Sequence, residues 1–192
     1  MDDAKRARSL FFSHGLGPYV LMGNDHQKPL IYVLQSNAYI LDNARGIILF
    51  TAHWEASQPH ISAGQTPQIY YDYAGAPGLP QEAYEYRYPA PGNPDLAARI
   101  AQTLEGAGFQ PVLGTTRGWD HGLFVPLLVM RPQADLPVVQ MSILKGSYEA
   151  HPEGKAEHFM PFLIAAGAAG NGPGRNTRSW NLFGAPMSTY LW

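Results

Sequence analysis

The chain of 192 residues carries 13 basic and 15 acidic side chains, and this balance excludes the basic excess that is typical of nucleic-acid-binding proteins. It contains no cysteine, which excludes disulfide bonds, thiolate metal sites and a cysteine nucleophile. The charged N-terminus lacks the apolar stretch of a signal peptide, and no apolar run approaches the roughly 20 residues that span a bilayer. We therefore expect one cytoplasmic domain over residues 1–192, with neither nucleic acid nor a membrane as a partner.

The first quarter of the chain predicts two strands that are each followed by a histidine. Leu10–Ser13 is a short apolar run that ends at His14. Leu30–Leu41 has apolar residues at helical spacing and predicts a crossover helix. The apolar run Ile47–Thr51 is typical of a strand buried on both faces of a parallel sheet, and it stops just before His53. Because ligands collect beyond the carboxyl ends of such strands, we expect both histidines at one edge of the same sheet.

The segment from Gln58 to Pro94 is rich in proline, glycine and tyrosine and shows no regular periodicity. Its tyrosines are Tyr70, Tyr71, Tyr73, Tyr84, Tyr86 and Tyr88. Long irregular segments in compact domains usually carry a function or are mobile. Two interpretations remain open at this point: a surface cover pinned by aromatic side chains, or the wall of a pocket for an aromatic ligand.

The second half of the chain predicts helices that alternate with strands. Leu96–Ala107 is a clear amphipathic helix, and Asn93-Pro94 suits its start. Further strands are predicted at Pro111–Leu113, at Leu136–Leu144 and within residues 184–190, and further helices at Leu123–Met130 and Pro161–Ala169. Together these elements predict an α/β fold, a three-layer sandwich in which a mostly parallel or mixed central sheet is flanked by helices.

Four of the seven histidines occupy positions that favour a role in a site. His14 and His53 end apolar strands, His121 lies in a tight polar turn, and His158 precedes the last predicted helix. Neutral imidazole is a common ligand of iron, zinc and copper, and three protein ligands leave open positions for a substrate. A metal site is therefore one interpretation, whereas ordinary surface or hydrogen-bonded core histidines are the other.

No compact motif decides between these interpretations. The chain contains no H-E-x-x-H, no G-x-S-x-G and no phosphate-binding loop. Glu55, Glu157 and Asp120 could act as hydrogen-bond partners that fix the tautomers of metal-binding histidines.

Six motifs that occur in one order along the chain resemble a known family. They are Phe12-Ser13-His14-Gly15, Thr51-Ala52-His53-Trp54-Glu55, residues 86–92 (YRYPAPG), Asp120-His121-Gly122, residues 137–142 (PVVQMS) and residues 157–161 (EHFMP) followed by AAGA at 165–168. Together they resemble the class III extradiol ring-cleavage dioxygenases, in the LigB-like branch that includes DOPA 4,5-dioxygenase. The resemblance covers the chain from about residue 10 to its end.

The resemblance implies a site and a reaction. His14, His53 and His158 would bind a non-haem metal, Fe(II) in the active protein with zinc as an alternative in the purified one. His121 would be the acid–base group that also contacts the substrate. The implied reaction is cleavage of the aromatic ring of a catechol, similar to DOPA, caffeate or protocatechuate, by O₂. A homodimer is a further expectation.

The chain departs from the family pattern in two places. The family usually reads S-H-G-x-P, whereas Gly17 here stands as an extra residue before Pro18. The family also has several tens of residues, including a further catalytic histidine, in a region that Lys145 to Ala156 crosses directly here. We therefore expect His121 to take the acid–base role. Two alternatives remain: a catalytically impaired metal-binding or adaptor protein on the same scaffold, and a zinc-dependent hydrolase.

Overall fold

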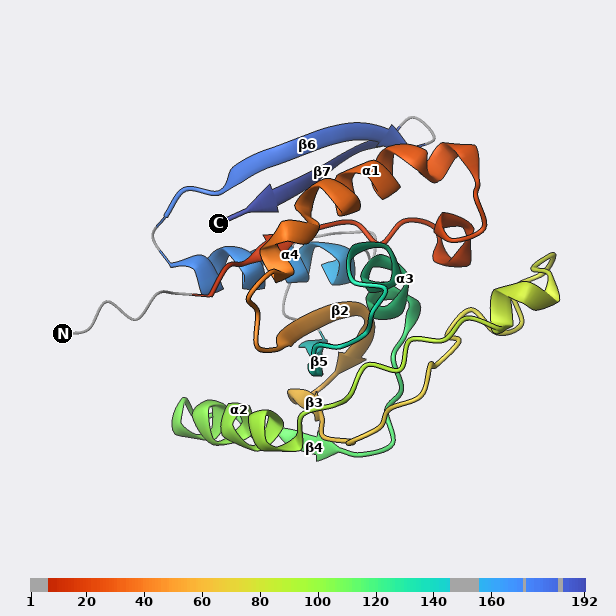
Figure 1. Ribbon diagram of the computed structural model, residues 1–192. Helices are drawn as coiled ribbons and strands as arrows, with labels where there is room; N and C mark the ends of the chain where they lie inside the picture. Colours follow the sequence, from red (N-terminus) through yellow and green to blue (C-terminus); the bar gives the residue numbers. More distant parts are fainter. Residues whose placement is uncertain (1–6, 146–155, 171, 183–184) are drawn as a thin grey trace.

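The computed structural model describes residues 7–145, 156–170, 172–182 and 185–192 of the chain (Figure 1). Within these residues the chain forms a four-stranded mixed sheet, a separate three-stranded sheet and four α-helices. The α/β class and the sandwich arrangement predicted from the sequence are confirmed. No helix among the described residues combines the length and the apolar character that a membrane span requires.

The four-stranded sheet has the order β2-β5-β3-β4. Strand β2 (Ile47–Ala56) runs parallel to β5 (Val138–Leu144), which pairs antiparallel with β3 (His60–Ser62), and β3 runs parallel to β4 (Val112–Gly114). Six of the seven residues of β5 are buried, because helices cover both faces of the sheet. A strand that is buried on both faces has a continuous apolar sequence rather than one that alternates between apolar and polar residues.

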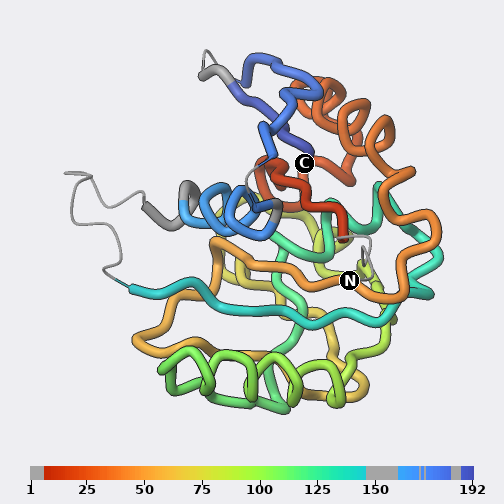
Figure 2. The backbone as a smooth tube through the Cα atoms, turned by 90° about the vertical axis from the view of Figure 1, so that its left-hand side faces the viewer, coloured from red at the N-terminus to blue at the C-terminus, as the bar shows by residue number. Residues whose placement is uncertain are grey.

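Helix α2 (Pro94–Gly106) covers one face of this sheet, and helices α3 (His121–Met130) and α4 (Ala156–Ala169) contact β2 (Figures 1 and 2). Helix α1 (Lys28–Asn37), which a 3₁₀ turn extends to Leu41, packs against α3. Strand β5 separates two buried clusters, since Val138 packs in the cluster of α1 and α3 and Val139 packs against α2. Neighbouring residues of a strand point to opposite faces, so one strand serves both cores.

The smaller sheet joins the two ends of the chain. Strand β1 (Leu10–Phe11) pairs antiparallel with β7 (Ala185–Leu191), which pairs antiparallel with β6 (Arg175–Leu182). The prediction that the strands before His14 and His53 share one sheet was therefore wrong. The reason is that β1 is only two residues long and takes its partner from the C-terminal hairpin.

Three predicted boundaries also differ from the structure. Strand β2 does not stop before His53 but continues to Ala56, with a register shift between Phe50 and Glu55. Helix α3 begins at His121, so the predicted polar turn leads straight into it. Helix α4 begins at Ala156 rather than at Pro161, so this proline lies inside the helix, where its missing N–H removes one helical hydrogen bond.

Candidate metal centre

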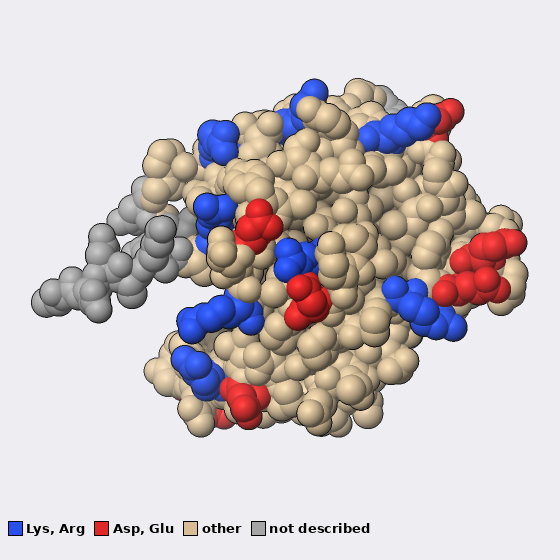
Figure 3. Space-filling view, viewed as in Figure 1, with Lys and Arg blue, Asp and Glu red and all other residues tan. Residues whose placement is uncertain are grey.

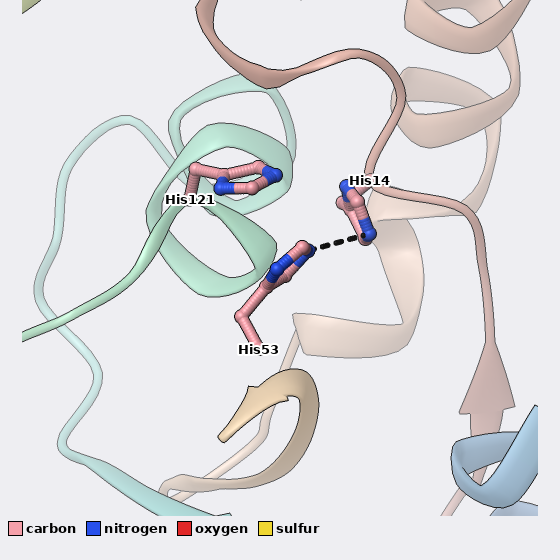
Figure 4. Close-up of side chains that lie close together, drawn as sticks. All are labelled: His14, His53 and His121. Atoms are coloured by element: carbon pink, nitrogen blue, oxygen red, sulfur yellow. Dashed lines mark hydrogen bonds between the residues drawn. The ribbon is translucent and has the colours of Figure 1, made fainter. Parts of the chain in front are cut away.

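Three histidines from distant parts of the chain come together at one point (Figure 4). His14 follows β1, His53 lies in β2, and His121 is the first residue of α3. The Nε2 atoms of His14 and His53 are 3.0 Å apart. The ring centroid of His121 lies 4.0 Å from that of His53 and 4.9 Å from that of His14. His14 and His53 thus converge as expected, although they come from different sheets.

One ring nitrogen from each of these histidines lies within 4.8 Å of the others. Imidazole nitrogens bind zinc and similar ions at about 2.1 Å, so small side-chain rotations would let all three reach one ion. The donor set therefore fits a metal of the iron or zinc type. His158 lies in α4, but its side chain falls outside the described residues, and so does that of Glu157. Their predicted roles stay predictions.

The irregular part of β2 explains why His53 points into this cluster. The register of the β2–β5 pair shifts between Phe50 and Glu55, so the intervening residues leave the regular ladder. The backbone N–H of His53 donates instead to Thr51 Oγ1 at 3.1 Å. Such irregularities bend a strand and redirect its side chains, and they are frequent next to functional sites.

Glycine at position 122 allows α3 to approach β2 closely. A methyl group on Gly122 would lie 2.8 Å from Thr51 Oγ1 and 2.9 Å from His53 Cδ2. These distances are shorter than any ordinary contact, so a larger residue would push α3 away from His53. The D-H-G sequence therefore combines a histidine at the helix start with the small residue that brings it near the other two imidazoles.

A carboxylate that the sequence did not single out fixes the third histidine. Asp72 Oδ2 accepts a hydrogen bond from His121 Nδ1 at 2.8 Å, and Asp72 Oδ1 accepts one from the backbone N–H of His121 at 3.0 Å. Asp72 Oδ2 also lies 3.6 Å from His53 Nδ1. Burial alone would raise the pKa of Asp72, but its hydrogen bonds and charge interaction with His121 outweigh burial and lower it. Asp72 is therefore a carboxylate at neutral pH.

Asp120 does not contact a histidine ring among the described residues, contrary to the expectation that it would fix a tautomer. It is fully buried and accepts hydrogen bonds from Thr51 Oγ1 at 2.8 Å, from Arg117 Nη2 at 2.9 Å and from Gln140 Nε2. Burial raises the pKa of Asp120, and the bonds from Thr51 and Arg117 oppose that rise. Its role is to tie β2, β5 and the start of α3 together beneath the cluster.

Arg117 extends this buried network to the backbone of His53. Its Nη2 donates to the carbonyl oxygen of His53 at 3.2 Å as well as to Asp120. Its guanidinium lies 4.8 Å from the ring centroids of both Trp54 and Tyr70, in the range of cation–π contact. Two aromatic rings and one carboxylate thus hold Arg117 in a single orientation beside β2.

The tyrosine-rich segment packs against the core and reaches the cluster. The rings of Tyr71 and Tyr73 lie 6.2 and 6.4 Å from that of Phe124 in α3, and Tyr73 lies 6.0 Å from His121. Burial raises the pKa of Tyr73, so it is protonated at neutral pH. The tyrosines of this segment therefore cover the core, whereas the pocket for an aromatic ligand stays a prediction.

A cavity of about 1710 Å³ is lined by His14 and by residues of β1, β2 and α4. It exceeds the roughly 300–1,000 Å³ of typical small-molecule sites. Of the three clustered histidines only His14 lines it.

Acidic and basic side chains are interspersed on the face seen in Figure 3, so no broad patch of one sign covers that face.

The α/β sandwich thus brings three imidazoles and one carboxylate together, and the imidazoles could hold a metal ion. Residues 10–153 match the family described as the catalytic LigB subunit of aromatic ring-opening dioxygenase. The chain therefore belongs to the LigB family.

Relatives of known name are similar to this chain over about 70% of its length. The dioxygenase tasH of Hapsidospora irregularis is 44% identical over 140 residues, which cover 69% of this chain and 42% of that protein. The 4,5-DOPA dioxygenase extradiol of Beta vulgaris is 38% identical over 138 residues (70% and 49%). That of Escherichia coli K12 is 34% identical over 140 residues (72% and 48%). The chain thus spans about half the length of the curated relatives it matches.

A solved structure supports the fold. The crystal structure of an uncharacterized protein from Escherichia coli K12 superposes with a TM-score of 0.68 and 21% sequence identity, over 97% of this chain and 99% of that one. At this level of identity the likeness concerns the fold alone.

Proposed function

We propose that this chain is an extradiol dioxygenase that uses Fe(II) and O₂ to cleave the aromatic ring of a catechol. The observation that carries the proposal is the convergence of His14, His53 and His121 in a chain of the LigB family. The names of its relatives, which include a dioxygenase and several DOPA extradiol dioxygenases, support the choice of reaction.

In this proposal His14 and His53 bind the metal, and His158 is the third ligand that the family resemblance implies. When bound, the metal would supply a centre that binds the catechol and O₂ and passes electrons between them. Zinc would fit the same imidazoles and is the ion expected to replace iron in purified protein. The chain itself must then bind the ring, exclude water and move protons.

His121 is the proposed acid–base group. Its Nδ1 donates to Asp72, which leaves Nε2 free of a proton and able to accept one from a catechol hydroxyl group. Imidazole changes its charge near neutral pH and can therefore take up a proton and return it within one reaction cycle. The ring of Tyr73 lies 6.0 Å from that of His121, and the ring of Tyr71 lies 5.9 Å from that of Tyr73, so the two would form an apolar wall for the aromatic substrate.

The test is turnover of a catechol by metal-loaded protein. The chain is loaded with Fe(II) without air, mixed with DOPA or caffeate, and then exposed to O₂. We expect O₂ uptake and a yellow ring-opened product. We also expect His121→Ala to lower kcat by about 10²- to 10⁴-fold, the usual loss when a positioned acid–base group is removed. The exposed His26 provides a matched control, and His26→Ala should leave the rate unchanged.

One observation favours a second candidate. Because the chain spans about half the length of its curated relatives, it could bind the metal without turning over a catechol. This alternative predicts tight metal binding that depends on His14 and His53, together with no O₂ uptake on any catechol. Metal analysis and oxygen-electrode measurements on the same sample distinguish the two functions.

A further inference from the structure

We infer that Asp72 is a positioning residue that holds His121 in the tautomer with its proton on Nδ1 and turns the unprotonated Nε2 toward His14. The inference deepens the proposed function, because it states how His121 could serve as a base. It starts from Asp72 in the tyrosine-rich segment, since this residue lies 49 residues before His121 in the sequence and yet makes two hydrogen bonds to it.

The two bonds determine which nitrogen carries the proton. A carboxylate has no proton to donate, so the 2.8 Å contact between Asp72 Oδ2 and His121 Nδ1 requires the ring nitrogen to be the donor. In the neutral ring, the proton then lies on Nδ1 and not on Nε2. Figure 4 shows the other nitrogen of His121 facing toward His14, and so toward the centre of the cluster.

The second bond, to the backbone N–H of His121, fixes the position of the residue that carries the ring. Asp72 Oδ1 accepts the backbone N–H of His121, which is the first residue of α3. The N–H groups of the first helical turn have no partner within the helix, and a negative charge near them is favourable. One carboxylate therefore anchors both the start of α3 and the side chain that this residue carries.

Asp72 is itself held by its neighbours. Tyr71 donates its hydroxyl hydrogen to the carbonyl oxygen of Tyr86 at 2.8 Å, and Tyr73 donates to that of Ala83 at 2.6 Å. Both tyrosine rings also pack against Phe124 in α3. The side chain of Asp72 is only 10% exposed. The carboxylate is thus fixed before any substrate arrives, so that orienting His121 costs little further conformational entropy.

The same carboxylate faces a second ring of the cluster. Asp72 Oδ2 lies 3.6 Å from His53 Nδ1, while His53 Nε2 lies 3.0 Å from His14 Nε2. Asp72 therefore favours Nε2 of both rings as the nitrogen turned toward the centre. In the proposed step the catechol O–H bond breaks, an N–H bond forms at Nε2 of His121, and the resulting imidazolium lies against the Asp72 carboxylate. The proton later returns from Nε2, so the transfer needs no oxidant or further reactant.

Asp72→Asn tests the inference because it inverts the donor pattern with little change in shape. In the variant, Oδ1 of residue 72 can still accept the N–H of His121, which leaves the amide NH₂ facing Nδ1. The amide would then donate to Nδ1 and move the ring proton to Nε2. We would record two-bond ¹H–¹⁵N spectra of the ¹⁵N-histidine-labelled full chain, metal-free and with Zn(II), and assign the His121 signals with His121→Gln.

The expected result is a proton on Nδ1 of His121 in the wild type and on Nε2 in Asp72→Asn, with kcat of the Fe(II)-loaded variant lowered by about 10²- to 10⁴-fold. Asp25→Asn provides the matched control, because Asp25 is 81% exposed and forms a surface ion pair with Lys28. It should change neither the tautomer nor the rate.

A wild-type spectrum with the proton on Nε2 would overturn the inference, whether or not the variant folds. An unchanged Nδ1 tautomer in Asp72→Asn would overturn it too. Inactive wild-type protein whose tautomer still switches in Asp72→Asn would support the role of Asp72 and count against the proposed dioxygenase.

Discussion

Gly122 shows at the scale of a single residue how the site depends on close packing. It sits between His121 and the core of α3, and it is the point at which this helix meets Thr51 and His53 of β2. The adjacent side chains are fixed, since Thr51 donates to the buried Asp120 and accepts from the His53 backbone. A small residue here is therefore a condition for the approach of His121 to His53.

We expect Gly122→Ala to lower the free energy of unfolding by about 1–3 kcal/mol, the usual cost of overpacking a close contact. The added methyl group would displace either α3 or the ring of His53, so Zn(II) affinity should fall as well. Urea unfolding and metal titration measure the two effects. Gly106→Ala at the end of α2 is the control, because a methyl group there meets nothing within 4 Å. Equal behaviour of the two variants would show that the close approach does not matter.

The lowered pKa of Asp72 predicts a pH dependence of stability. Since the folded-state pKa of Asp72 lies below its unfolded value of about 3.9, the ionised carboxylate stabilises the fold above that pH. This contribution should disappear as the pH falls through the folded-state pKa. We therefore expect the stability difference between the wild type and Asp72→Asn to shrink as the pH falls below about 4.

Urea unfolding at a series of pH values measures this difference. Asp95→Asn, a change at an exposed position of α2, provides the reference for the loss of a surface carboxylate. A stability difference between the wild type and Asp72→Asn that does not change between pH 6 and pH 3 would contradict the assignment of Asp72 as a stabilising carboxylate.

At the scale of whole elements, the tyrosine-rich segment links the core to the cluster. Tyr73 makes three kinds of contact there: its hydroxyl group donates to Ala83, its ring packs against Phe124, and its ring edge lies near His121. The segment has little regular structure, so its shape depends on such side-chain bonds more than on backbone ladders.

Tyr73→Phe should lower the free energy of unfolding by about 1 kcal/mol, because it removes one hydrogen bond and leaves the carbonyl of Ala83 without that donor. Because Tyr73 is adjacent to Asp72, we also expect kcat to fall for any catechol that the protein cleaves. Tyr70→Phe is the matched control, since Tyr70 is 48% exposed and its ring contact with Arg117 would survive the change. A larger loss in Tyr70→Phe than in Tyr73→Phe would refute this description of the segment.

Elements with a strong periodic pattern could be predicted from the sequence, and those without one could not. Leu96–Ala107 has a clear apolar stripe and a capping asparagine, and α2 occupies nearly that range, with Asn93 Oδ1 accepting the N–H of Leu96. Strand β6 has a polar sequence with mostly exposed side chains, so no hydrophobic pattern indicated it. Strand β3 is only three residues long and lies inside the irregular segment.

The same contrast holds for the site. His14, His53 and His121 could be singled out because each follows an apolar run of the sequence or lies in a short polar stretch flanked by glycines. Asp72 could not be singled out from the sequence. Its contact with His121 depends on the path of an irregular segment that brings Asp72 back against α3. The pairing of β1 with the C-terminal hairpin could not be predicted from the sequence either, since long-range strand pairing leaves no local pattern in so short a strand.

At the scale of the whole molecule, the histidine cluster joins the two sheets. His14 extends from β1 of the three-stranded sheet, whereas His53 belongs to β2 of the four-stranded sheet. An ion bound by both rings would therefore cross-link residues that belong to different sheets. Metal binding should consequently stabilise the whole fold and not only the site.

We expect Zn(II) at 100 times its dissociation constant to raise the free energy of unfolding by about 2.7 kcal/mol, because an ion that binds only the folded state shifts the equilibrium by mass action. Urea unfolding with and without Zn(II) measures the shift, and a chelator should reverse it. His53→Ala should abolish most of the stabilisation, whereas His26→Ala, which removes an exposed imidazole outside the cluster, should retain it. Equal stabilisation of these two variants would mean that the ion is held elsewhere, and the convergence of His14 and His53 would then need another explanation.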